Sequence, residues 1–299
     1  MATTLINTAL EPLYMHQSWM GSASLCAAKQ DPKHLEHPDY DPTPSEAMSF
    51  GSLVHALIAQ QIGPLSAGYD FSLPQPAAIF NLWQQLAIER DGFILDRQAE
   101  LGSLRKSVLE ARDALDAWYR AIWQPSLQHE DIIAHEVELE KLIGYLSSGR
   151  AVILRGTPDV VKRLALDDWK TSGRWFDQGK ADAQIQGPTY AILAEHCYPK
   201  VAPIRSMTYW VYNRSKGAWS PAVQTITKES KAALAATAMQ FAAMREAGVY
   251  PPTPAANSGR NGRNWHCSPK YCNAWNMCDY KGLIPDGADL TARRNRGWS

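Results

Sequence analysis

The feature that most constrains the fold is a run of short, β-branched or alternating segments between residues 132 and 172. The segments IIAHEVELEKLIGYL, AVILRGTPDVV and LALDDWKTS are separated only by SSGR and VKR. This pattern predicts three consecutive strands, with VKR as the turn before the last of them. The last strand ends in acids and a lysine where a buried strand would carry aliphatic residues, which raises the question of what these polar groups do.

Helical patterns flank the strands. Thr43 and Glu46 have the spacing of a capping box with Pro44 between them, and apolar residues at helical intervals follow over 45–61. At the far end, Ser220 as the N-cap, Pro221 as the first residue, an alanine-rich body and Gly248 as the stop predict a long helix. Three further elements are expected: a helical tract over 80–124 interrupted near Asp91, a helix over 180–198 and a strand over 204–215.

These elements predict an α/β fold with a mixed central sheet flanked by helices, over one domain of residues 1–299. The mainly helical part is expected at 1–130, the strands at 131–215, and a long helix with a cysteine-rich tail at 216–299.

Composition limits the class of protein. The 30 Lys and Arg residues balance the 30 Asp and Glu residues, so no global field attracts a polyanion. No apolar run reaches the ~18 residues of a membrane span, and the first residues lack the pattern of a signal peptide. We therefore expect a cytoplasmic protein without membrane contact. The five cysteines are an odd number, which argues against a disulfide framework.

The polar end of the last predicted strand has the composition of a metal site. Because side chains alternate along a strand, Asp168 and Lys170 project to one face and Trp169 to the other, at an end expected to face solvent. Asp159 should lie on the neighbouring strand near the same end. Two carboxylates there can hold Mg²⁺ or Mn²⁺ for phosphodiester hydrolysis, with Lys170 as a point charge. The alternative is a turn acid plus a surface strand pair.

These residues resemble the PD-(D/E)XK nucleases, in particular the RecB-type branch that includes phage recombination exonucleases of the exonuclease VIII kind. GTPDVV and LDDWKTS look like the strand-borne Asp and the D-x-K of that branch. The resemblance implies a restriction-endonuclease-like fold, metal ligands at Asp159, Asp168 and the Trp169 carbonyl, and a catalytic Lys170.

Two more motifs of that branch occur in the expected order. GSLVH places His55 on a helix as a metal ligand or neighbour, and QGPTY supplies Gln186 and Tyr190 for positioning DNA. If Pro188 starts this helix, Gln186 falls in its cap or in a loop. An acid upstream can assist the site, and Glu136 and Glu138 are both candidates.

A cysteine tail suggests a second metal. Cys267, Cys272 and Cys278 are separated by four and five residues, and clustered thiolates suit iron–sulphur or zinc. Many RecB-type nucleases are similar in having three C-terminal cysteines and one near the N-terminus on a [4Fe–4S] cluster. That resemblance implies Cys26 as the fourth ligand, and His266 or Cys197 could replace it.

The function implied by the resemblance is metal-dependent exonucleolytic cleavage of DNA in recombination or repair of phage or bacterial DNA. A single-strand annealing protein is an expected partner, and the protein could be oligomeric. One alternative is a catalytically inert, DNA-binding or structural relative stapled by a metal cluster. Another is a zinc-stabilised enzyme of unrelated chemistry with an accidental D-x-K.

Overall fold

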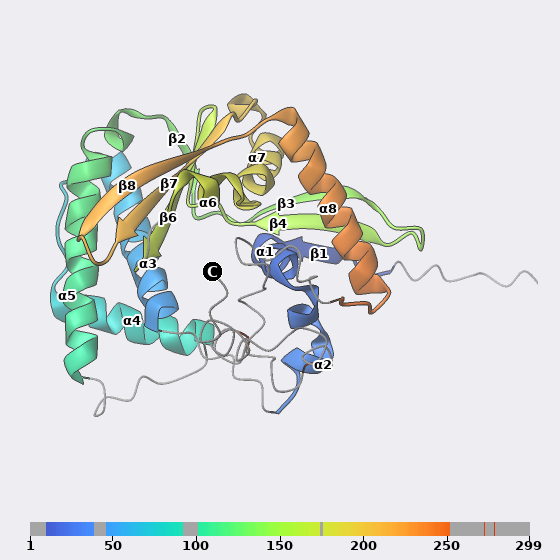
Figure 1. Ribbon diagram of the computed structural model, residues 1–299. Helices are drawn as coiled ribbons and strands as arrows, with labels where there is room; N and C mark the ends of the chain where they lie inside the picture. The colour runs from blue at the N-terminus through green and yellow to red at the C-terminus, as the bar shows by residue number, and fades with distance from the viewer. Residues whose placement is uncertain are drawn as a thin grey trace, which may run out of the picture. The chain divides into compact units, whose positions relative to one another are not determined.

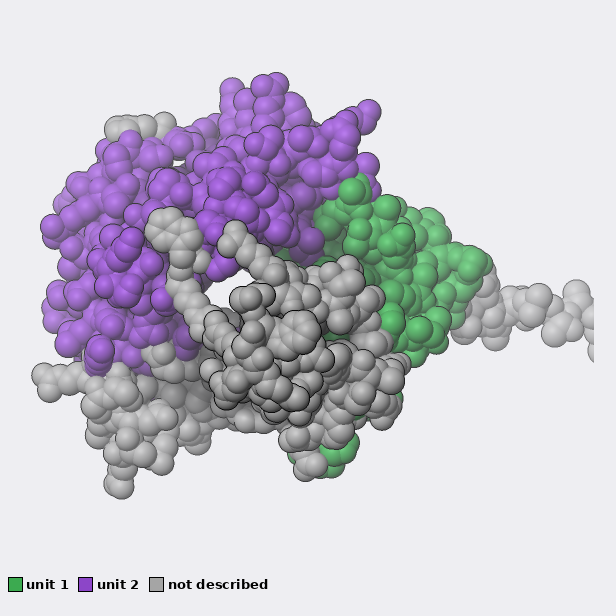
Figure 2. Space-filling view, in the orientation of Figure 1, with its two compact units in different colours: residues 1–42, 142–154, 233–299 green, residues 43–141, 155–232 purple. Residues whose placement is uncertain are grey.

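The computed structural model describes residues 10–38, 46–91, 101–173 and 176–251, together with Cys272 and Cys278. The chain divides into two compact units (Figure 2). Unit 2 consists of Thr43–Lys141 and Arg155–Ala232, and unit 1 of Met1–Pro42, Leu142–Leu154 and Ala233–Ser299. No described helix is both long enough and apolar enough to cross a membrane.

Unit 2 is built on a mixed sheet, as predicted. Among the described residues its five strands have the order β2-β5-β6-β7-β8. Only β6 and β7 are parallel; the other pairs are antiparallel. The strands are β2 (Ile132–His135), β5 (Val160–Lys162), β6 (Ala165–Ser172), β7 (Ser206–Asn213) and β8 (Ala218–Thr225).

Helices cover the sheet of unit 2 (Figure 1). The buried core joins α3 and α5 to the sheet: the ring of Trp169 on β6 meets that of Trp118 on α5 edge to face, with 5.9 Å between centroids. The neighbouring side chain, Asp168, contacts α7 instead. The helical segments of this unit are α3 (Glu46–Ser66), α4 (Pro76–Asp91), α5 (Leu101–Trp118), η2 (Tyr119–Trp123), η3 (Leu127–His129), α6 (Gln178–Asp182), α7 (Gln186–Cys197) and η4 (Pro199–Val201).

Unit 1 carries a second described sheet with the strand order β1-β4-β3. Strands β3 and β4 and helix α8 start or end in unit 2. The elements are β1 (Leu13–His16), α1 (Gln17–Leu25), η1 (Ala27–Gln30), α2 (Pro32–Leu35), β3 (Leu139–Tyr145), β4 (Ala151–Gly156) and α8 (Lys228–Glu246).

The prediction of three consecutive strands was wrong in number and pairing. The first run divides into β2 and β3 at Glu136, whose φ of 49° is incompatible with a strand, and the second divides into β4 and β5. Lys162 lies within β5, so the turn before β6 is Arg163–Leu164 and not VKR; Leu164 has a φ of 66°. The predicted interruption near Asp91 agrees with the end of α4.

The start of the last helix was also predicted wrongly. Ser220 and Pro221 lie in β8, at the edge of the sheet, where a strand residue without an N–H is tolerated. Helix α8 begins at Lys228, where Thr227 and Ser230 exchange side-chain bonds with each other's N–H groups. Gly248 follows its end with a φ of 65°, as the pattern indicated. Thr43 and Pro44 lie outside the described residues.

A buried ion pair joins the β5–β6 hairpin. The Nζ of Lys162 lies 2.8 Å from the Asp167 carboxylate and 3.2 Å from that of Glu130. Asp167 is 1% exposed. Burial raises the pKa of Asp167, although Lys162 opposes that rise. An acid this deep in the protein depends on its cation.

Replacing Lys162 with methionine should lower the free energy of unfolding by about 3 kcal/mol, because it leaves the buried Asp167 without its cation. The double variant Lys162→Met/Asp167→Leu should recover most of this loss. Urea unfolding at pH 7 measures both. A Lys162→Met protein as stable as the parent would contradict a structural role for the pair.

Candidate active site

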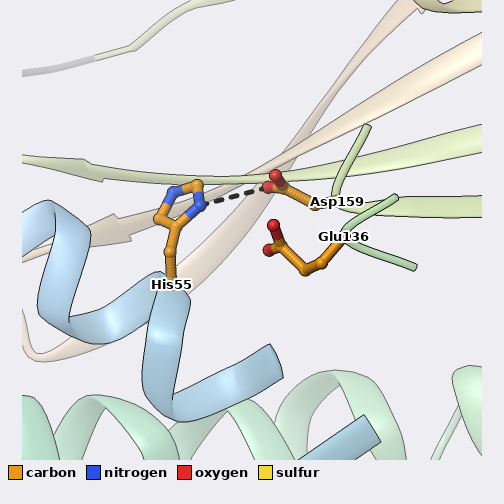
Figure 3. Close-up of side chains that lie close together, drawn as sticks. All are labelled: His55, Glu136 and Asp159. Atoms are coloured by element: carbon orange, nitrogen blue, oxygen red, sulfur yellow. Dashed lines mark ion pairs between the residues drawn. The ribbon is translucent and has the colours of Figure 1, made fainter. Parts of the chain in front are cut away.

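Asp159 is the centre of the site (Figure 3). It directly precedes β5, and the register of β5 with β6, continued by one residue, sets it opposite Asp168. The N–H of the next residue, Trp169, donates to Asp159 Oδ2 at 2.6 Å. The same oxygen lies 3.4 Å from His55 Nδ1 on α3. One ligand atom each from His55, Glu136 and Asp159 lies within 4.8 Å of the others. The site thus gathers donors from helix α3, the bend after β2 and the residue before β5.

The structure favours Glu136 over Glu138 as the assisting acid. Glu136 has a left-handed backbone, and its N–H donates to the carbonyls of Pro158 and Asp159, both at 3.2 Å. This conformation is strained for a non-glycine residue, and such strain is concentrated at functional sites. Glu138 instead lies 3.8 Å from Arg155.

Asp168 and Lys170 lie on β6 beside Asp159. The Lys170 Nζ is 2.5 Å from Asp168 Oδ2. The expectation that this strand end faces solvent was wrong for the acids, because Asp159 and Asp168 are buried, while the Lys170 side chain keeps 27% of its exposure. Helix α7 begins beside Asp168 and helps to bury it, whereas Asp159 is enclosed by its contacts with His55 and Trp169.

Gln186 and Tyr190 are one turn apart on α7 and share a face. The Gln186 amide nitrogen lies 3.3 Å from Asp168 Oδ1 and 3.4 Å from the Tyr190 hydroxyl. Gln186 is the first residue of α7, so it is neither a cap nor a loop residue, and Pro188 sits in the first turn. The helix predicted over 180–198 is two helices, α6 and α7. Gln186 points to Asp168, and the Tyr190 hydroxyl contacts Gln186; a contact of either side chain with DNA remains a prediction.

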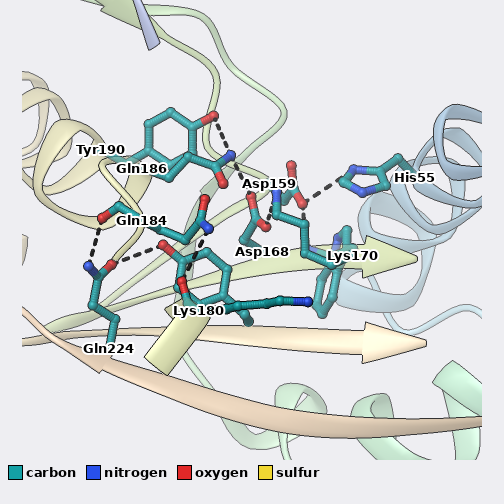
Figure 4. Close-up of polar contacts among 11 residues, drawn as sticks. His55, Asp159, Asp168, Lys170, Lys180, Gln184, Gln186, Tyr190 and Gln224 are labelled. Carbon is teal, nitrogen blue, oxygen red and sulfur yellow. Dashed lines mark hydrogen bonds and ion pairs between the residues drawn. The ribbon is translucent and has the colours of Figure 1, made fainter. Parts of the chain in front are cut away.

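A buried network that the sequence did not indicate holds this turn in place (Figure 4). The hydroxyl of Tyr209 on β7 accepts the Gly187 N–H and donates to Gln224 Oε1 at 2.9 Å. Gln224 Nε2 donates to the carbonyls of Gln184 at 2.7 Å and Asp182 at 3.2 Å. A side chain at position 187 would overlap Gln224, which explains the glycine. The network therefore sets where Gln186 meets Asp168.

Gly51 has a similar role on the other side. A Cβ there would lie 2.9 Å from Thr171 Oγ1 on β6. The glycine lets α3 approach β6 closely enough for His55, one turn further on, to reach Asp159. This gives a physical reason for the glycine in GSLVH.

Proximity and burial shift the acidity of these groups. Burial raises the pKa of Asp168 to about 6, although the positive charge of Lys170 opposes this rise. Burial and the charge of Asp159 raise the pKa of Glu136 to about 7. Burial also opposes ionisation of Asp159 and His55, but their mutual attraction outweighs it. The pKa of Asp159 is therefore lowered and that of His55 raised. Three acids thus crowd one imidazole and one lysine, which is an environment that favours a bound cation.

The donor set fits a divalent metal ion. Carboxylate oxygens are ligands for Mg²⁺ and Mn²⁺, and imidazole suits transition metals such as Mn²⁺. Burial is the first cause of the raised pKa values of Glu136 and Asp168, and the charge of Asp159 adds to it, so a cation beside these acids would favour their ionised forms. His55, Glu136, Asp159 and Asp168 could hold such an ion, with Lys170 beside it.

Only some of the predicted cysteine ligands lie within the described residues. Cys26 and Cys278 are buried, Cys272 is partly buried and Cys197 is exposed. Cys267 and His266 lie outside the described residues. Within the described part of the chain, the cysteines form no group with metal-ligand spacing.

The stability of the metal-free protein should fall as pH rises from about 4 to 7. The folded pKa of Asp168, about 6, exceeds its ordinary value of 3.8, so the folded state binds more protons in this window. Asp168→Asn mimics the neutral acid. It should raise the free energy of unfolding at pH 8 in EDTA by about 1–3 kcal/mol, and the gain should vanish near pH 4.

Urea unfolding across this pH range measures the effect. The exposed Asp131→Asn is the matched control and should follow the parent protein. A gain for Asp168→Asn that persists unchanged at pH 4 would show that the effect does not come from ionisation.

Comparisons with known proteins identify the family of the chain. The family model described as the PD-(D/E)XK nuclease superfamily matches residues 28–279. No curated protein gives a significant match. A candidate exonuclease from Eubacterium rectale shares 11% identity, covering 83% of this chain and 88% of its own, with a TM-score of 0.46. The structure of SSO0001 shares 12% sequence identity with this chain, and the match covers 77% of this chain and 95% of SSO0001, with a TM-score of 0.31.

Likenesses at these TM-scores are too weak to add evidence about function. The family match, by contrast, spans far more than half of the sequence and contains every residue of the site described above. The chain belongs to the PD-(D/E)XK nuclease superfamily.

Proposed function

We propose that this protein is a Mg²⁺-dependent DNA exonuclease. The observation that carries the proposal is the convergence of His55, Glu136 and Asp159 within 4.8 Å, beside the Asp168–Lys170 pair on β6. Members of this superfamily are nucleases that use divalent metals, which agrees with the donor set. The exonucleolytic mode, the role in recombination or repair and an annealing-protein partner rest on the resemblance to phage recombination exonucleases.

The chemistry of each side chain indicates its role in the proposed reaction. His55, Glu136, Asp159 and Asp168 would hold the ion, with the Trp169 carbonyl as a further donor. The ion, when bound, polarises the phosphodiester and favours ionisation of a water. Lys170, held at Asp168 and partly exposed, supplies positive charge where the phosphoryl oxygens gain negative charge. Gln186 fixes the rotamer of Asp168 from the opposite side.

A catalytically inert relative is the second candidate. It would keep the fold and bind DNA without cleavage. The structure disfavours it, because an inert protein gains nothing from burying Asp159 and Asp168 beside a strained Glu136 at a cost in stability.

Substitutions in the site should separate metal binding from catalysis. Asp168→Ala and Lys170→Ala should each lower DNA cleavage by about a hundredfold or more. Titration calorimetry with Mn²⁺ should show weaker binding for Asp168→Ala and unchanged binding for Lys170→Ala, since only Asp168 is proposed as a ligand.

Glu136→Gln and Glu138→Gln form the matched pair for this test. The first should lose activity and Mn²⁺ affinity and the second should keep both, because only Glu136 faces Asp159. Equal effects of the two substitutions, or full activity of Lys170→Ala, would refute the assignment of the site.

We also propose that the cysteine tail binds a [4Fe–4S] cluster, with zinc as the alternative. The support is the spacing of Cys267, Cys272 and Cys278, the resemblance to RecB-type nucleases and the burial of Cys26 and Cys278. All of these cysteines belong to unit 1. The cluster would stabilise the end of the chain rather than take part in cleavage.

Protein purified without oxygen should be brown and carry about four irons per chain, with broad absorption near ~400 nm. Cys272→Ser should bleach it and lower the melting temperature, whereas the exposed Cys197→Ser should change neither. Elemental analysis and thermal unfolding measure this. A colourless protein that holds one zinc would show that the tail binds zinc and not an iron–sulphur cluster. A stable protein without any metal would contradict both alternatives.

A further inference from the structure

A row of alternating lysines and aromatic rings leads away from Lys170. Its Nζ lies 6.0 Å from the centroid of the Tyr209 ring. That ring lies 5.7 Å from the ring of Phe176, and the Nζ of Lys180 lies 6.0 Å from the Phe176 centroid. Tyr209 pairs with Asp168 in the register of β7 and β6, so this row starts on the face of the sheet that carries the site.

Apart from Lys170, which already belongs to the proposed active site, the residues of this row that can meet a ligand are the two outer ones. Tyr209 is fully buried and serves as the support for Phe176. Phe176 is partly exposed and Lys180 is exposed. In Figure 4 the side chain of Lys180 runs in the direction of Lys170. We call Phe176 and Lys180 the outer pair.

Helix α6, which carries Lys180 and begins two residues after Phe176, is anchored to the sheet. Helix α6 is capped by Asp177, which accepts the Lys180 N–H at 2.9 Å. Ala181 is fully buried, and Gln224 of β8 donates to the Asp182 carbonyl at 3.2 Å. The Asp182 carboxylate accepts from Gln178 within the same helix. A helix fixed in this way presents its side chains with little ordering cost on binding.

We propose that the outer pair is a subsite for the single-stranded segment of nucleic acid next to the phosphodiester that is cleaved. A base stacks on the exposed side of the Phe176 ring, and Lys180 binds the adjoining phosphate. Stacking on an aromatic ring accepts every base, and an ammonium group suits a phosphate without fixing its orientation. The subsite therefore serves a nuclease that moves along a strand regardless of sequence. This inference rests on the proposed function and extends its substrate contacts.

Binding of a fluorescent single-stranded oligonucleotide to the full chain in EDTA tests the subsite without catalysis. Phe176→Ala should weaken binding about tenfold, whereas Phe176→Trp should retain it, because stacking needs only an aromatic ring. Lys180→Ala should lower the slope of log affinity against log salt by about 0.7, and Lys180→Arg should retain the slope. Lys106→Ala, an exposed lysine of α5, is the control and should leave the slope unchanged.

Activity gives a second readout that a purely structural role would not move. The ratio of DNA cleavage to hydrolysis of bis(p-nitrophenyl) phosphate should fall about tenfold in Phe176→Ala, since the small ester has no neighbouring base to stack. A misfolded variant would lose both activities together. If Phe176→Ala misfolds, Phe176→Trp and Lys180→Ala still test the subsite.

Failure of the subsite and failure of the proposed function are distinguishable. A parent protein that cleaves neither substrate but binds the oligonucleotide through the outer pair would refute the nuclease function and retain the subsite. Unchanged binding by Phe176→Ala, with an unchanged salt slope for Lys180→Ala, would overturn the subsite even if DNA is cleaved.

Discussion

The carboxylate of Asp159 is the group on which the site depends, because one of its oxygens connects separate elements. It accepts the Trp169 N–H from β6 at 2.6 Å and lies 3.4 Å from His55 of α3. The backbone carbonyl of the same residue accepts from Glu136 after β2. A hydrogen bond to a buried charged group contributes roughly 1.5–3 kcal/mol, so these contacts hold α3, β5 and β6 in one geometry. The hairpin places the acid, and the acid in turn fixes the helix that supplies the imidazole.

The electrostatics of the site explain why a cation belongs there. The buried Asp159 and Asp168 lie beside the exposed Glu136 and the partly exposed His55 and Lys170. The pKa of Glu136 is raised to about 7 and that of Asp168 to about 6, so the metal-free protein pays for their ionisation near neutral pH. A divalent ion would remove this penalty. Because such an ion would bind the folded state and not the unfolded chain, it would also raise the stability of the protein.

Much of the site could be predicted from the sequence because its residues lie in short motifs. Asp159, Asp168 and Lys170 follow from strand alternation across one tight hairpin, and His55 and Gln186 follow from the order of motifs typical of the superfamily. Glu136 could not be separated from Glu138 by pattern, because the difference between them is a left-handed backbone and not a residue type. Tyr209 and Gln224 were missed because their contacts arise from strand register and from the position of α7.

The fold shows the same limit. Ser220–Pro221 is a helix start by local pattern, but the same pair is acceptable in an edge strand, and the pairing of β8 with β7 decides between them. Strands β3 and β4 join β1 in one sheet, whereas β2 and β5 join β6 in the other. Local sequence does not specify these pairing partners. Hydrophobic periodicity predicted the helices around Trp118 and His55 because their buried faces pack on the sheet whichever way it is ordered.

Digestion of end-labelled linear DNA and covalently closed circular DNA, each with Mg²⁺ and with EDTA, tests the central claim most directly. A Mg²⁺-dependent exonuclease should degrade linear DNA from its ends only when Mg²⁺ is present and should leave closed circles intact. Cleavage of both forms in EDTA, or no cleavage of either form at any metal concentration, would contradict it.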